Sequence, residues 1–140
     1  MKKYTFKKYG VTVQFPPELD IELSEEGTDD PVYTFLGTQC GINFILENSH
    51  YSEKEAEDVF KTCIKKLKVD KSSLDDDDIE TPNGGGSFFI GTRTDDSDVL
   101  VVIAIIASSV SEQTIVVTAT FGCDPNLIGQ IVGSIVFSEE

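Results

Sequence analysis

His50, the only histidine, and the three cysteines are the residues best suited to nucleophilic or metal chemistry. A serine or cysteine hydrolase would need His50 as its base. The sequence has no G-x-S-x-G motif for a nucleophilic serine and no C-x-x-C pair for zinc. We therefore predict a protein that is not an enzyme and has no catalytic residues. The alternative is a hydrolase or a metal site that uses His50.

Carboxylates are the next candidates for chemistry, because calcium prefers oxygen ligands. The two densest aspartate segments are residues 75–78 and 95–98. Neither has the glycine and the terminal glutamate of an EF-hand loop, so we expect solvated loops. The glycine-rich residues 83–86 lack the Lys-Ser/Thr pair of a phosphate-binding loop and predict a flexible turn. The sequence thus predicts neither a metal nor a cofactor.

The net charge of −14 at pH 7 is the strongest functional signal in the sequence. Residues 18–30 hold seven acids and no base, and residues 69–98 hold nine acids and two bases. So acidic a surface repels nucleic-acid phosphates and anionic membranes and favours a basic partner. We predict a basic protein as the partner, with no nucleic acid and no membrane. The candidate partner-binding residues are Glu22, Glu25, Glu26, Asp29, Asp30, Asp75, Asp76, Asp77, Asp78, Asp95, Asp96 and Asp98.

The cysteines also bear on the compartment. Cys40, Cys63 and Cys123 are odd in number and have no paired spacing, which fits a reducing compartment better than a disulfide framework. No apolar segment follows the basic residues 2–9 as a signal peptide requires, and these residues predict a salt-bridging strand or a frayed terminus. We expect a cytoplasmic protein. An exported protein whose leader has been removed would have the same sequence, so that alternative stays open.

One apolar stretch, residues 99–107, must organise the fold. It contains no polar residue, and most of its side chains are β-branched, which favours a strand. It is too short to span a bilayer, which needs roughly 18 apolar residues. A strand without alternation is typical of a sheet that is covered on both faces. We therefore predict a buried central strand with a helix on each side.

Two helices are predicted to form these covers. Residues 51–68 begin with a capping box of Ser52 and Glu55 and continue with an apolar stripe. Acids crowd the first turns of this segment and lysines the last, which suits the helix dipole. Residues 124–134 begin with Asp124 as the N-cap and Pro125 at the first helical position.

Alternation and turn residues predict the strands. Residues 9–15 form a first strand that ends at Pro16 and Pro17, and residues 32–38 and 42–48 form a hairpin. Residues 87–94, 99–107 and 112–122 form an antiparallel meander. Short strands are expected near residues 21–23 and 136–137. The fold class is therefore α/β in the α+β sense: an α/β/α sandwich around a mainly antiparallel sheet of about six strands, in one domain over residues 1–140.

This order of elements resembles the PsbP-like superfamily, which includes the photosystem oxygen-evolving subunit P, a Ran-binding import factor and bacterial DcrB-like proteins. The residues that carry the resemblance are Gly-Val-Thr-Val-Gln-Phe-Pro-Pro at 10–17 and Leu-Ile-x-x-Ile-x-x-Ser-Ile-x-Phe at 127–137. The resemblance implies an α/β/α sandwich and a binding or accessory role. Some bacterial relatives act as chaperones or accessory factors for secreted toxins.

Charge and resemblance together predict a non-catalytic acidic protein-binding module that engages a basic partner, as a toxin-neutralising (immunity), chaperone or adaptor protein would. Electrostatic steering would raise its association rate. The alternative is a small-molecule or lipid-binding accessory domain with a pocket between sheet and helix. A large apolar cavity would favour that alternative.

Overall fold

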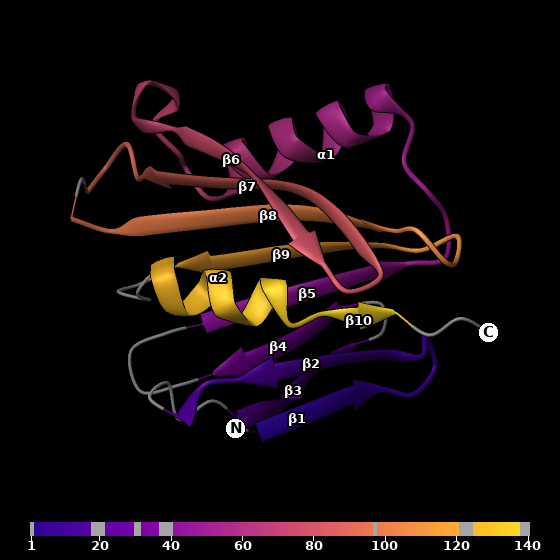
Figure 1. Ribbon diagram of the computed structural model, residues 1–140. Coiled ribbons are helices and arrows are strands. Elements are labelled where there is room, and N and C mark those ends of the chain that lie inside the picture. Colours follow the sequence, from indigo (N-terminus) through magenta and orange to yellow (C-terminus); the bar gives the residue numbers. More distant parts are fainter. Residues whose placement is uncertain are drawn as a thin grey trace.

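The computed structural model describes residues 2–17, 22–29, 32–36, 41–96, 98–120 and 125–137. Its centre is a sheet of seven antiparallel strands (Figure 1). The α+β class with a mainly antiparallel sheet and two helices is confirmed. In spatial order the strands are β3 (Glu22–Asp29), β4 (Val32–Leu36), β5 (Gly41–Glu47), β9 (Thr114–Thr120), β8 (Leu100–Ser108), β7 (Gly84–Thr92) and β6 (Asp75–Thr81).

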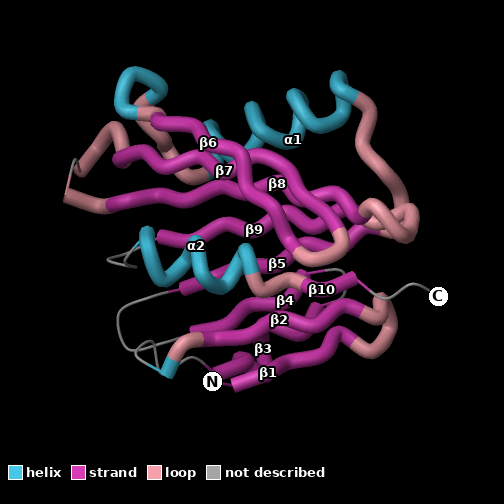
Figure 2. The backbone as a smooth tube through the Cα atoms, viewed as in Figure 1, coloured by secondary structure: helices cyan, strands magenta, loops and turns pink. Residues whose placement is uncertain are grey.

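Different elements cover the two faces of this sheet (Figure 2). Helix α1 (Glu53–Lys66) lies on one face and is followed by a single 3₁₀ turn, η2 (Lys71–Ser73). Helix α2 (Pro125–Gly133) lies on the other face, beside a second sheet. That sheet has the order β1 (Lys2–Phe6), β2 (Val11–Phe15) and β10 (Val136–Phe137).

The second sheet was not predicted, although β2 and β10 were, and a strand within residues 2–9 was one of two alternatives. Residues 2–6 form a regular strand, in which Tyr4 pairs with Val13 of β2. At the other end of the chain, Phe137 of β10 pairs with Val11. The apolar side of this small sheet joins the aromatic core of the large one, where Phe6 contacts Phe44 with ring centroids 5.6 Å apart.

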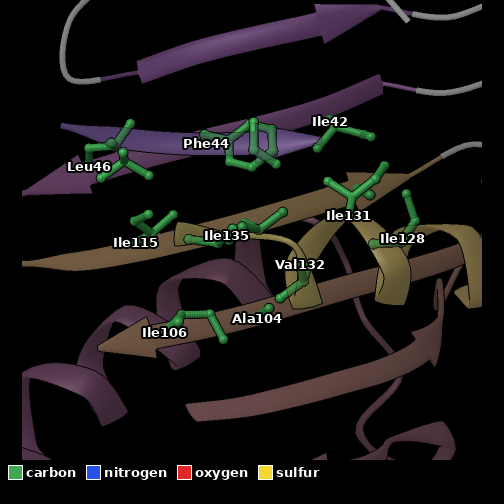
Figure 3. Close-up of a cluster of buried hydrophobic side chains, with 14 of the residues drawn as sticks. Ile42, Phe44, Leu46, Ala104, Ile106, Ile115, Ile128, Ile131, Val132 and Ile135 are labelled. Carbon is green, nitrogen blue, oxygen red and sulfur yellow. The ribbon is translucent and has the colours of Figure 1, made fainter. Parts of the chain in front are cut away.

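Strand β8 joins the two cores, as a strand with no polar face should. Val102, Ala104 and Ile106 belong to the core under α2, which also includes Ile131 and Val132. Figure 3 shows the Val132 side chain beside Ala104. The alternate residues Val101 and Ile103 belong to the core under α1. The predicted burial on both faces is confirmed for residues 101–104 and for Ile106, but it fails at Ala107, which is exposed.

Local signals placed α1 correctly. The Ser52 side chain accepts from the Glu55 amide at 3.1 Å, and the Glu55 carboxylate accepts from the Ser52 amide at 3.4 Å. Cys63 is buried, as the apolar stripe requires. The helix ends in a Schellman turn, in which the Val69 amide donates to the Ile64 carbonyl and Lys68 takes a φ of 54°.

Two predicted loops are strands, and both predictions were wrong. Residues 75–78 are the first four residues of β6, which pairs with β7 over its whole length. Aspartates can form such a strand because its hydrogen bonds involve only the backbone, and because the side chains of an edge strand stay in water. Of residues 83–86, only Asn83 lies in the turn, together with Pro82, and Gly84–Gly86 begin β7. The predicted short strand near residues 21–23 is also longer, because β3 runs to Asp29.

The hairpin of β6 and β7 curls over the α2 face of the sheet (Figure 1). Its turn reaches the small sheet, where the Asn83 side-chain amide donates to the Phe137 carbonyl at 2.7 Å. The close approach of β7 to β8 explains why residue 86 is a glycine, because a Cβ at this position would clash with the Ile105 carbonyl. In the described part of the chain, neither helix has the length and apolarity to cross a membrane.

Two glycine-to-alanine variants should change stability in opposite directions. Gly86→Ala should lower the free energy of unfolding by about 1–3 kcal/mol, because the added methyl group meets backbone. Gly129→Ala should raise it by about 0.5–1 kcal/mol, because Gly129 lies within α2 with open space around it. Urea denaturation measures both. A stabilising Gly86→Ala would contradict the close approach of β7 and β8.

Candidate functional site

A groove opens where the first turns of α1 stand away from the sheet. Its volume is about 320 Å³. Ala56, Glu57 and Phe60 of α1 form one wall. Phe89 of β7 and Ile105 and Ala107 of β8 form much of the floor. Most of the lining is apolar, so this groove has the character that the predicted small-molecule alternative requires.

Small side chains leave the groove unfilled. Gly85 and Gly86 of β7 contribute no side chain to its floor, and Ala56 and Ala107 contribute one methyl group each. Farther along α1 the gap closes: the rings of Phe60 and Phe89 lie 4.4 Å apart. Beyond that pair, the buried core under α1 includes Cys63 and Ile64. The groove is therefore confined to the beginning of the helix.

The register of β6 places acids beside this groove. Residues that pair directly in an antiparallel sheet point to the same face. Asp76 pairs with Phe89, Asp78 with Ser87 and Glu80 with Gly85, and all three partners line the groove. Asp76, Asp78 and Glu80 therefore project on the α1 face, next to the groove floor.

The other two aspartates of β6 project on the opposite face. Asp75 pairs with Ile90 and Asp77 with Phe88, so their side chains point toward the face that carries α2. A second hollow, of about 390 Å³, lies there between β6 and α2, and all four residues 75–78 contribute to its lining. The four aspartates at 75–78 are all exposed, so β6 is an acidic edge with a carboxylate row on each face.

The remaining candidate partner-binding residues are not gathered with β6. Glu22, Glu25, Glu26 and Asp29 belong to β3, at the opposite edge of the seven-stranded sheet. Their side chains, and the whole of Asp30, lie outside the described residues. The two acidic segments of the sequence thus supply the two edge strands of the sheet.

The acidic segment at 95–98 is engaged within the chain. Arg93 donates to Asp95 at 2.8 Å, and the Lys68 ammonium lies 3.8 Å from the same oxygen. Desolvation opposes ionisation of Asp95, but the hydrogen bond from Arg93 and the charges of Arg93 and Lys68 hold the pKa of this carboxyl below its ordinary value. Asp96 accepts from the Asp98 amide at 3.0 Å, and both residues are exposed.

Among the residues that the structure describes, no group of three or more His, Cys, Asp or Glu side chains is arranged to hold a metal ion. His50 lies at the corner between β5 and α1. Its Nε2 is 2.9 Å from the Ser108 carbonyl and 2.8 Å from the Ser111 carbonyl. Because carbonyls only accept, this nitrogen carries a proton and donates. The contacts tie the corner to the turn between β8 and β9.

Two titratable side chains lie near the groove or under it. Partial burial, followed by the charges of Glu47 and Glu55, raises the pKa of Tyr51, a lining residue. Burial raises the pKa of the Cys63 thiol, against the opposing effect of Lys66. Cys40 and Cys123, which we predicted to be unpaired, lie outside the described residues.

Comparison with known proteins adds a fold and no function. No known protein family matches the sequence, and no curated protein matches it. An uncharacterised protein from Bacteroides thetaiotaomicron VPI-5482 has a similar crystal structure, with a TM-score of 0.59 and 11% sequence identity. The similarity covers 99% of this chain and 49% of that one, so this chain spans about half of its length.

The buried thiol gives a test of the packing under α1. In a Cys40→Ser/Cys123→Ser variant, Cys63 should react with iodoacetamide at pH 8 at least about tenfold more slowly in the folded protein than in urea. Burial blocks access and the raised pKa lowers the thiolate fraction. Mass spectrometry follows the labelling, and a triple variant that also has Cys63→Ser gives the background. Equal rates in both states would contradict the packing.

Proposed function

We propose that the protein is a non-catalytic binding module that recognises a basic protein through β6. One observation carries this proposal: four consecutive aspartates are exposed on an edge strand. β6 pairs with β7 on one side, and the described residues provide no strand on its other side. Lysines and arginines of a partner could therefore meet carboxylates on either face of the edge.

Electrostatics favours such an encounter. Four adjacent negative charges on a chain of net charge −14 attract cations over the Debye length, about 10 Å at 0.1 M salt. Charges on an edge strand also keep copies of the chain from pairing edge to edge. A test must therefore show attraction of a base rather than repulsion between copies alone.

The biological settings that fit this activity are those the sequence suggested. We propose a toxin-neutralising (immunity), chaperone or adaptor role in a bacterial cytoplasm, and a PsbP-like relationship stays a prediction. A hydrolase or metal site on His50 gains little support from its geometry, because its Nε2 donates to two backbone carbonyls. His50→Ala should therefore leave partner binding unchanged.

The groove beside α1 favours a second candidate function. Its volume of about 320 Å³ lies at the lower end of the range for small-molecule sites, about 300–1,000 Å³. Its lining is mostly apolar, as the linings of small-molecule sites are. The protein would then be an accessory domain that binds a small amphiphilic molecule.

Binding to a lysine-rich peptide tests the first proposal. A variant without the four charges should have a dissociation constant about tenfold higher, because exposed ion pairs contribute about 0.2–1 kcal/mol each. Its substitutions are Asp75→Asn, Asp76→Asn, Asp77→Asn and Asp78→Asn. Raising the salt concentration from about 0.1 M to about 1 M should slow association, since the Debye length falls to about 3 Å. Fluorescence anisotropy and stopped flow measure the two quantities. A glutamate-rich peptide of equal length should not bind.

The matched control removes four exposed charges elsewhere, with Glu53→Gln, Glu57→Gln, Asp58→Asn and Glu112→Gln. It should weaken binding much less than the β6 variant. Equal losses would show that net charge, rather than β6, attracts the peptide. Binding that ignores salt would contradict the proposal altogether.

A further inference from the structure

We infer that the groove between α1 and the sheet binds a small amphiphile with an apolar body and a cationic head. This inference rests on the second proposed function and does not require protein binding by β6, although it uses Asp76 and Asp78 of that strand. It combines two observations: the groove is lined largely by apolar side chains, and its one charged lining residue, Glu57, is an acid, with further acids of the neighbouring strand β6 on the same face of the sheet.

The apolar body has a defined place. Phe60 and Phe89 close one end of the groove, and Ile105 and Ala107 offer a floor on which an alkyl or aromatic group can lie. Ala107 is exposed, so a ligand there would take apolar surface out of water. The glycines beside it, Gly85 and Gly86, let the ligand approach the backbone of β7.

The charge of the head follows from the surroundings. Glu57 is the charged residue that lines the groove. Glu53 stands one turn earlier on α1, on the same side of the helix. Across the groove floor, Asp76, Asp78 and Glu80 project on the α1 face of β6. A cation in the mouth would therefore have carboxylates on both sides.

Basic residues nearby only partly offset these acids. Lys61 pairs with Glu57 at 3.1 Å, but both side chains are 64% exposed, so the pair is weak and a bound cation can replace it. Lys54 is the one lysine in the first half of α1. At the beginning of the groove, burial and then the charges of Glu47 and Glu55 raise the pKa of Tyr51. The field at the mouth is therefore negative, and it disfavours fatty acids and anionic lipids.

Three probes with one tail separate the effects of body and head. Decyltrimethylammonium, decyl maltoside and decyl sulfate share a ten-carbon chain and differ in the charge of the head. Titration calorimetry below the critical micelle concentration should show the highest affinity for the cationic probe, a lower affinity for the neutral probe and the lowest for the anionic probe. We expect the cation to bind at least tenfold more tightly than the anion.

Groove variants show where the probe binds. Ala107→Trp should abolish binding, because the new ring fills the groove. Val110→Trp adds the same ring to an exposed position in the turn after β8 and should leave binding unchanged. Thermal unfolding of both variants confirms that each is folded. Unchanged binding by a folded Ala107→Trp would place the probe elsewhere and overturn the inference.

The side chains of β6 alternate between the two faces of the sheet, and this alternation supplies the control for charge. Asp76→Asn/Asp78→Asn removes two charges on the α1 face, and Asp75→Asn/Asp77→Asn removes two on the α2 face. The first variant should weaken binding of the cationic probe about threefold or more, and the second should not. Equal losses would show attraction by net charge alone and overturn the inference.

The outcomes for the two ideas differ. If no probe binds, the second proposed function itself fails. If all three bind the groove with equal affinity, the groove is a ligand site but the preference for a cation is wrong. A tighter anion would overturn that preference directly.

Discussion

Burial of β8 on both faces is the constraint on which the rest of the structure depends. A strand with no polar side needs two covers, and each cover must bring its own apolar surface. One is α1, with Cys63 and Ile64. The other is built from α2 and the small sheet, which meet β8 through residues such as Ile131 and Val132. Because the middle of the sheet is committed to burial, the acidic segments fall at its two edges, in β3 and β6.

The same constraint explains why the chain has a groove at all. β8 is apolar as far as Ala107, but α1 covers it only as far as Phe60 reaches Phe89. Beyond that point, Ala107 meets water next to glycines of β7. The apolar surface that the helix leaves uncovered lies beside Glu57, and Asp76, Asp78 and Glu80 of β6 project on the same face of the sheet.

The sequence predicts what depends on neighbouring residues. The capping box at Ser52 and Glu55 sets the start of α1, and alternation and turns set the meander of β7, β8 and β9. It does not predict that β5 pairs with β9, since that contact joins segments far apart in the chain. Nor does it reveal β6, because four aspartates have low strand propensity and only pairing with β7 holds them extended. The sequence offers a pocket between sheet and helix only as an alternative and does not place it, because the groove depends on Gly85 and Gly86, whose run resembles a turn.

The small sheet has a consequence for synthesis of the chain. Its middle strand, β2, obtains its neighbour β1 early, but β10 follows only after all the strands of the large sheet. On the ribosome, the pairing of Val11 with Phe137 must therefore wait until the large sheet has emerged. Until then the exposed edge of β2 is a place where a nascent chain could associate wrongly, and rapid closure by β10 is the safeguard that the topology provides.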